Sequence, residues 1–192
     1  MMRVSLIAAT VLLCACASGG NSSGSEPPDL RATSQYTRVE LPSGAPIEID
    51  WEHQHTYQET TLLVGVDKAW AAYPAVFGEL GIEPGIVDSK QHVYGNAGIK
   101  MRNSLGRLRL SKYFDCGTTA GMSNADTYDV LVRVVSQVLA ADAGVSTLRT
   151  QVEATAHANA VSGATVRCVS TGALEERIAH MLSELTAKPN AS

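Results

Sequence analysis

Two histidines lie two positions apart in the segment Trp51-Glu52-His53-Gln54-His55. On a β-strand, residues at this spacing share one face, which is how paired metal ligands can be presented. A metal site needs further ligands, and only Glu52 or the distant His157 could supply one in space. Because the ligand set is incomplete, we interpret the pair as a polar strand edge and predict neither a metal nor a cofactor.

A second chemically rich segment, residues 111–121, mixes aromatic side chains, hydroxyls, a carboxylate and glycines around Cys116. Loops of this kind often carry functional residues, and a Cys116 thiolate beside a histidine would be a nucleophile. The patterns of serine hydrolases, zinc proteases and nucleotide-binding loops do not occur in the chain. Asp126 and Asp129 form no acid/base pair by spacing. We predict that the protein is not an enzyme, and a hydrolase built on the Asp115 loop and a histidine ranks last among three hypotheses.

Five cations crowd one short region that contains no acidic residue: Lys100, Arg102, Arg107, Arg109 and Lys112. The pattern predicts a hairpin of two strands, 99–102 and 107–110, with a turn between them. Alternation would place the cations largely on one face and four apolar side chains on the other. The apolar four are Ile99, Met101, Leu108 and Leu110. The basic face could contact anionic lipid headgroups or an acidic partner; the alternative is a solvated face that only discourages aggregation.

The one stretch apolar enough to meet a membrane is N-terminal, where Arg3 precedes the apolar residues 4–13. A positive start, an apolar run of about 10 residues and small residues after it are typical of a secretory signal peptide, and the run is too short for a spanning helix. Leu13-Cys14-Ala15-Cys16 resembles the lipobox of bacterial lipoproteins. It predicts a signal peptide over residues 1–15 and lipidation at Cys16. The alternative is ordinary cleavage after Ala15-Cys16-Ala17.

The expected location follows from this resemblance. Such lipoproteins usually carry three acyl chains, palmitate among them, which is more than stable anchoring requires. Ala17 rather than aspartate follows Cys16, which in lipoproteins of two-membrane bacteria favours the outer membrane. We therefore expect a lipid-anchored protein in the cell envelope, on the inner leaflet of the outer membrane and facing the periplasm. Residues 16–34 are small and polar and predict a flexible tether.

Two cysteines remain after the signal peptide and lipidation site, Cys116 and Cys168. An even pair in an exported protein predicts a disulfide. Its loop of about 50 residues corresponds to about 4 kcal/mol of stabilisation as an upper value. Two buried free thiols are the alternative, and a metal pair is disfavoured because no CxxC spacing occurs.

The remainder, residues 35–188, predicts a single folded domain. The chain has 192 residues, of which 45% are hydrophobic and 18% charged, and a net charge of −4. Such a composition is that of an ordinary folded protein, and the negative charge excludes strong overall attraction to nucleic acid. Strands are expected over 36–41, 47–49, 57–64, 86–87 and 91–94, and a long antiparallel pair over 128–135 and 148–156 with a turn at 142–144.

Two amphipathic helices complete the predicted elements. The first begins at Asp67 as N-cap, carries Trp70 and Phe77 on one apolar face, contains a break or kink at Pro74 and stops at Gly81. The second is capped by Ser170 or Thr171, and Leu174, Ile178, Met181, Leu182 and Leu185 form its apolar stripe. A sheet with one apolar face needs cover, which these helices provide. The predicted fold is α+β: a mostly antiparallel sheet covered on one face by two helices, a helix-grip-like two-layer sandwich.

Val66-Asp67-Lys68-Ala69-Trp70, Leu80-Gly81-Ile82 and the strands that follow resemble the domains of the BamC family, lipoproteins of the outer-membrane β-barrel assembly machine. The resemblance covers about residues 60–187 in the order of the elements, and residues 113–117 have no counterpart in it. It implies the helix-grip fold and a role beside that machinery.

The first functional hypothesis is therefore a non-enzymatic lipoprotein that faces the periplasm and binds another protein or an envelope component. The second is a carrier of a small apolar ligand, held between the sheet and the helix that carries Trp70 and Phe77. A generous cavity there would favour the carrier, and a packed core would oppose it.

Overall fold

The computed structural model describes residues 36–40, 44, 46–50, 57–158, 163 and 165–187. The chain divides into two units, residues 1–32 and 33–192, and only the second contains described residues. The predicted signal peptide, the lipidation site Cys16, the tether and the His53/His55 pair all lie outside the described residues. No helix in the described part is both long and apolar enough to cross a membrane.

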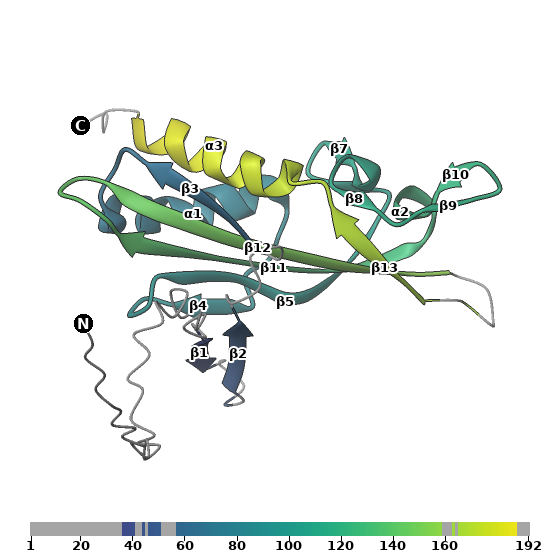
Figure 1. Ribbon diagram of the computed structural model, residues 1–192, viewed down its shortest axis with the longest axis horizontal. Helices are drawn as coiled ribbons and strands as arrows, with labels where there is room; N and C mark the ends of the chain where they lie inside the picture. The colour runs from purple at the N-terminus through teal and green to yellow at the C-terminus, as the bar shows by residue number, and fades with distance from the viewer. Residues whose placement is uncertain are drawn as a thin grey trace, which may run out of the picture. The chain divides into compact units, whose positions relative to one another are not determined.

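Strands make up about half of the described residues (Figure 1). They are β1 (Tyr36–Glu40), β2 (Pro46–Asp50), β3 (Tyr57–Leu62), β4 (Ile86–Asp88), β5 (Val93–Arg102), β6 (Ser104–Leu105), β7 (Leu108–Arg109), β8 (Phe114–Asp115), β9 (Thr118–Thr119), β10 (Met122–Ser123), β11 (Asp129–Ala140), β12 (Ser146–His157) and β13 (Thr165–Ser170). The helices are α1 (Val66–Leu80), α2 (Asn124–Thr127) and α3 (Ala173–Ala187), with a short 3-10 helix, η1 (Leu110–Lys112).

A seven-stranded antiparallel sheet forms the centre of the fold, in the order β4-β5-β11-β12-β13-β8, with β3 also paired to β12. The long strand β12 pairs with two strands, β3 and β13, along the same edge. Its residues 146–151 pair with β3, and its residues 154–157 pair with β13. The predicted class, α+β with a mostly antiparallel sheet packed against helices, is confirmed.

The long pair β11–β12 confirms the strongest strand prediction. The two strands of 12 residues run in register from Asp129↔His157 to Ala140↔Ser146. The predicted turn closes them: the Val145 N–H donates to the Asp142 carbonyl, and Gly144 takes a left-handed φ of 76°. A residue without a Cβ adopts that conformation without strain.

Helix α1 differs from its prediction at the start. Gly65 is the N-cap, because its carbonyl accepts the first intrahelical bond from Ala69, and Asp67 lies inside the first turn. The Asp67 carboxylate there faces the positive end of the helix dipole instead of capping it. The helix runs without a break through Pro74. It ends as predicted at Gly81, whose φ of 72° lets its own N–H and that of Ile82 bond the last carbonyls.

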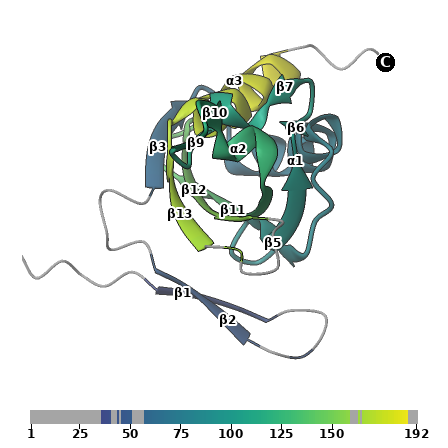
Figure 2. The ribbon, with the colours of Figure 1, turned by 90° about the vertical axis from the view of Figure 1, so that its right-hand side faces the viewer.

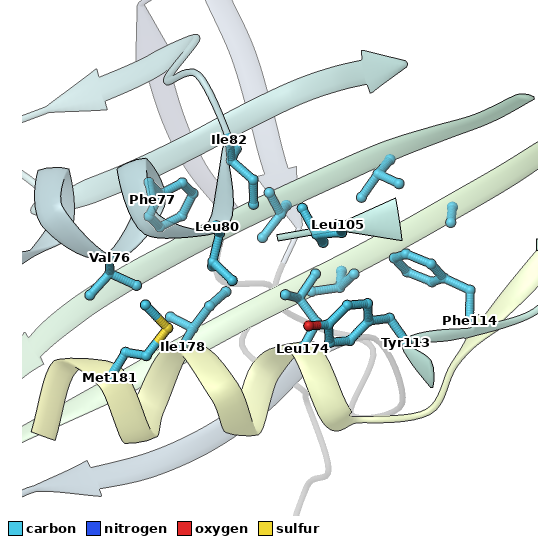
Figure 3. Packing of buried hydrophobic residues seen from close by; sticks show 14 of the residues in the cluster. Val76, Phe77, Leu80, Ile82, Leu105, Tyr113, Phe114, Leu174, Ile178 and Met181 are labelled. Atoms are coloured by element: carbon cyan, nitrogen blue, oxygen red, sulfur yellow. The ribbon is translucent and has the colours of Figure 1, made fainter. Parts of the chain in front are cut away.

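Helices α1 and α3 pack together over one face of the sheet (Figures 1 and 3). Val76 and Leu80 of α1 meet Ile178 and Met181 of α3, and all four are buried. The predicted capping residues precede α3: the Ser170 hydroxyl accepts the Gly172 N–H at 3.2 Å, and the Thr171 hydroxyl accepts the Ala173 N–H at 3.4 Å.

The opposite face of the sheet is partly covered as well. β1 and β2 form an antiparallel pair on that side (Figures 1 and 2), and their Val39 and Ile49 are buried against Ile86, Val93 and Val135. The Gln91 side chain adds a hydrogen bond to the Arg38 carbonyl at 2.8 Å. The smaller core formed there is additional to the cover that the helices provide on the other face.

The predicted hairpin over residues 99–110 is wrong in its pairing. Residues 99–102 are the end of β5 and pair with β11, with Met101 opposite Val130. Only two pairs join β6 to β7, Ser104↔Arg109 and Leu105↔Leu108. Pairing of β5 with β11 is more stable than the predicted hairpin because it buries Met101 under the helices. An isolated short hairpin is only marginally stable in water.

Candidate functional site

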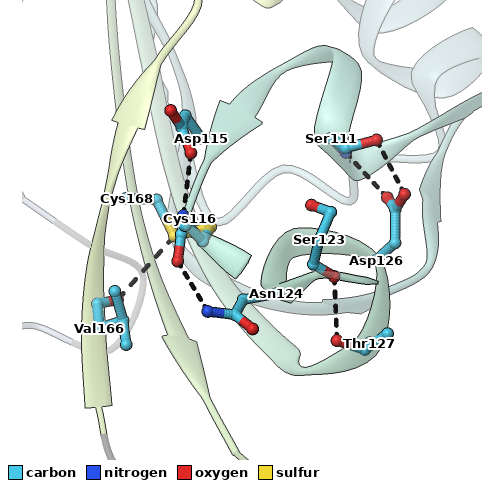
Figure 4. Close-up of a disulfide and its surroundings, with 10 residues drawn as sticks. Ser111, Asp115, Cys116, Ser123, Asn124, Asp126, Thr127, Val166 and Cys168 are labelled. Carbon is cyan, nitrogen blue, oxygen red and sulfur yellow. Dashed lines mark hydrogen bonds between the residues drawn. A yellow bond between two sulfur atoms is a disulfide. The ribbon is translucent and has the colours of Figure 1, made fainter. Parts of the chain in front are cut away.

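The predicted disulfide is present, and it joins Cys116 to Cys168 (Figure 4). Both residues are buried, with exposed fractions of 1% and 8%. The bond removes Cys116 as a free thiol, so the nucleophile considered for the Asp115 loop is not available in this state. Among the described residues, no group of three histidine, cysteine or carboxylate side chains is placed to hold a metal ion.

The segment before Cys116 is fastened to the start of α3 by backbone bonds as well. Strand β13, which the sequence analysis did not predict, pairs with β8 through Val169↔Asp115 and Ser170↔Phe114. The Thr171 N–H donates to the Tyr113 carbonyl at 2.9 Å, and the Thr171 hydroxyl donates to the Lys112 carbonyl at 2.8 Å. Disulfide, ladder and these two bonds together fix η1 and β8 beside α3.

Polar side chains on the other side of the same segment have structural partners. The Asp126 carboxylate accepts both the backbone N–H and the hydroxyl of Ser111, and the Asn124 amide donates to the Cys116 carbonyl at 3.0 Å (Figure 4). The Asp115 carboxylate accepts the Gly117 N–H at 2.9 Å. These carboxylates hold turns in place, and neither is paired with a histidine by any described contact.

A groove lies between the β7–η1 segment and the first half of α3, which are neighbours in both views (Figures 1 and 2). We call it the α3 groove. It has a volume of about 530 Å³ and is open to solvent. Leu108, Tyr113 and Ala173 supply apolar surface, and Leu108 is exposed although it is a large aliphatic residue. Four polar side chains complete the lining: Lys112, Glu176, Arg177 and His180.

Arg177 links the two walls of the α3 groove. Its side chain is half-buried, and a guanidinium N–H donates to the Tyr113 hydroxyl at 2.7 Å. Its Nη2 also approaches the backbone of Gly106, where an added Cβ would lie 3.7 Å away. In the described part of the chain, no carboxylate lies within salt-bridge distance of Arg177 or Lys112. Neither cation is therefore paired with a carboxylate, although Glu176 also lines the groove.

The structure divides the five predicted cations among different surfaces. Lys100 and Arg102 lie on β5 and reach Asp129, at 2.8 Å and 3.8 Å. Arg109 approaches Asp126 at 3.8 Å. The hydrogen bond from Lys100 lowers the pKa of Asp129 most, burial opposes this as the next largest cause, and the charges of Lys100, Arg102 and His157 lower the pKa further. Acidic partners that sequence spacing did not reveal thus come from β11 and α2.

Of the predicted basic set, Lys112 lines the α3 groove and Arg107 is exposed in the turn beside Leu108. The apolar set is divided too: Met101 and Leu110 are buried, whereas Leu108 faces the groove. Sequence reasoning singled out the segment that contains Tyr113 but missed Arg177 and its contact with Tyr113, because the two residues are 64 positions apart and meet only in the fold. An arginine on the polar side of a helix gives no signal of such a role.

The space proposed for an apolar ligand is filled with aromatic rings. Tyr73 stacks on Tyr94 with centroids 5.4 Å apart, and Phe77 meets Tyr94 edge-on at 4.9 Å. Trp70 packs against the same two tyrosines at 5.6 Å and 5.9 Å. Phe77 and Tyr73 are fully buried. The packing between α1 and the sheet is that of a core and not of a ligand cavity.

Comparisons of the chain with models of protein families, with curated proteins and with solved structures found no match. The resemblance to the BamC family therefore stays a prediction from short motifs.

Proposed function

We propose that the protein is a membrane-anchored lipoprotein that faces the periplasm and binds another envelope protein through the α3 groove, without catalysing a reaction. The observation that carries the proposal is the groove: an open, partly apolar surface whose walls are fixed to each other by a disulfide and by backbone hydrogen bonds. A fixed surface loses little conformational entropy on binding, which favours recognition of a partner.

The proposed location is supported by two independent features. The lipobox-like Leu13-Cys14-Ala15-Cys16 provides for anchoring, and a disulfide of this kind persists in oxidising compartments such as the periplasm. Placement in the inner leaflet of the outer membrane depends on Ala17 following Cys16. A role beside the outer-membrane assembly machinery depends on the resemblance to BamC.

Cross-linking in living cells tests the proposal. A photo-reactive amino acid replaces Leu108, which lines the groove, or Leu131, which is exposed on the face of β11 away from the helices. We expect illumination to give a discrete protein adduct from position 108 and none from position 131. Equal adduct yields from both positions, or none from position 108, would contradict binding through the groove.

The same cells report on anchoring. We expect the native chain to carry radiolabelled palmitate. We also expect it to be recovered with the outer membrane, because three acyl chains are more than stable anchoring requires. The Cys16→Ser variant should lose the label and leave the membrane fraction. A native chain that carries no acyl group and is soluble would overturn the location, whatever the cross-linking shows.

A further inference from the structure

We propose that the occupant of the α3 groove is an acidic segment of the partner protein, with a bulky apolar side chain placed between carboxylates. The inference rests on the proposed function and adds to it the chemistry of the partner. It begins from Arg177, which is half-buried beside the phenol of Tyr113 and has no carboxylate within reach among the described residues.

The charge of Arg177 is the first element of recognition. A cation that is partly removed from water without a counter-ion is stabilised when an anionic group binds to it. A guanidinium can bind a carboxylate through two parallel hydrogen bonds. One guanidinium nitrogen already bonds the Tyr113 hydroxyl at 2.7 Å, which holds the group in a single orientation. A carboxylate arriving in the groove would meet donors that are already placed.

Lys112 provides a second positive charge on the same groove. Its ammonium group is exposed, while its backbone carbonyl is fixed by the Thr171 hydroxyl. Glu176 is the one acidic residue in the lining, against Lys112 and Arg177, and the ring of His180 lies 3.5 Å from the carboxylate of Glu184. The two cations of this site attract a negatively charged segment, although the chain as a whole carries a net charge of −4.

The apolar part of the groove favours a partner segment that also carries a bulky apolar side chain. Leu108 is 43% exposed, next to the ring of Tyr113 and the methyl group of Ala173. One large apolar side chain placed there would remove this surface from water. A guest that carries both features is a peptide segment in which acidic and apolar residues alternate.

A protein segment fits the groove better than a lipid does. Binding sites for lipid-like molecules enclose most of the ligand, whereas this groove of about 530 Å³ is open to water. An acyl chain lying in it would stay largely hydrated. A peptide keeps its backbone and carboxylates in water and buries only one side chain.

Three synthetic peptides and one vesicle preparation test the inference with the oxidised domain. The first peptide alternates leucine and glutamate, the second has lysine in place of every glutamate, and the third has serine in place of every leucine. Vesicles of phosphatidylglycerol present negative charge on a lipid surface. Binding is followed by chemical-shift changes at the amides of Leu108, Ala173 and Arg177.

We expect the leucine–glutamate peptide to bind with an affinity at least about tenfold higher than either other peptide, and to weaken as salt is added. Lys112→Glu should reduce that affinity about fivefold, and Lys68→Glu, at an exposed position of α1, should leave it unchanged. Arg177→Gln removes the guanidinium and also its hydrogen bond to Tyr113. If Arg177→Gln unfolds for that reason, the affinity of Lys112→Glu tests the charge recognition instead. Equal binding of the acidic and basic peptides, shifts centred elsewhere, or binding of the vesicles alone would each overturn the inference.

Cross-linking from position 108 separates this inference from the function on which it rests. If Lys112→Glu cells give the same adduct in the same yield, the proposed charge recognition is wrong while binding through the groove stands. If no adduct forms in any cells, the proposed function itself fails.

Discussion

Glu175 is the residue whose environment departs most from that of an ordinary carboxylate. It lies in the first turn of α3 and is only 6% exposed. One carboxylate oxygen accepts the Ser170 hydroxyl at 2.7 Å, and the other is buried without a partner in the described structure. Burial raises the pKa of Glu175, and the hydrogen bonds from Ser170 and from the backbone of the first turn oppose that rise only in part.

This pKa shift makes the stability of the protein depend on pH. A carboxyl whose pKa is higher in the folded than in the unfolded state binds its proton more tightly when folded. The stabilisation is therefore complete below the ordinary glutamate pKa of 4.5 and is lost as the pH rises through the raised folded value. Glu175→Gln mimics the neutral form, so we expect the variant to become progressively more stable than the native protein as the pH increases.

Urea unfolding at a series of pH values between about 4 and 7 measures this difference. Glu79→Gln, at an exposed position near the end of α1, is the control and should follow the native pH profile. A difference between Glu175→Gln and the native protein that does not change with pH would show that Glu175 stays charged throughout.

Among the elements, β5 contains a glycine whose backbone lies too close to β11 to admit a side chain. The pairing of β5 with β11 shifts register between Val132 and Val134, and Gly95 pairs with Val135 just beyond this irregularity. A Cβ on Gly95 would collide with the Val134 carbonyl oxygen and lie 2.9 Å from the Val135 Cα. Because these are backbone atoms within a central ladder, they cannot move aside without breaking hydrogen bonds.

We expect Gly95→Ala to lower the free energy of unfolding by about 3 kcal/mol, the upper end of what overpacking usually costs. Gly98 on the same strand gives a matched control, since a Cβ there would make an ordinary 3.6 Å contact with the Leu131 side chain. Gly98→Ala should change stability by less than about 0.5 kcal/mol. Urea unfolding of both variants checks the prediction, and equal values would contradict it.

The elements that could be predicted from sequence are those with long, regular patterns. The alternation in β11 and β12 and the apolar stripe of α3 each follow from burial of one face, which repeats along the element. The pairing of β5 with β11 could not be predicted. The alternation of apolar and basic residues around Met101 fits a local hairpin as well as it fits a long strand paired with β11. Strand β8 forms by pairing with β13, and β13 pairs with β12 as well, which local sequence does not show.

The candidate site was predictable only in part for the same reason. Lys112 was included in a basic set because of its spacing alone. The disulfide between Cys116 and Cys168 was predicted because an even number of cysteines remains in a chain expected to be exported. The central residue, Arg177, depends on the approach of Tyr113 and Gly106 from other elements. Contacts between residues 64 positions apart carry no signature in a single sequence.

For the whole molecule, the disulfide spans 52 positions and joins the middle of the chain to its last strand. A cross-link of this span restricts the unfolded chain, which corresponds to a stabilisation of up to about 4 kcal/mol. We expect a reductant to lower the free energy of unfolding by an amount up to this value, measured by urea unfolding. The free energy of unfolding of the Cys116→Ser/Cys168→Ser double variant should be insensitive to the reductant, and an unchanged value for the reduced native protein would contradict the prediction.

The order in which the chain is made has a consequence for the α3 groove. The wall that contains η1 and β8 is complete by residue 115, yet the groups that hold it come from residues 168–177: Cys168, Val169, Ser170, Thr171 and Arg177. A polypeptide released early, before residue 168, could still form the β5–β11–β12 ladder but would leave this wall unattached. Only a chain that extends through the first half of α3 can complete the groove that we propose for recognition, so copies ending before residue 168 would not compete for the proposed partner.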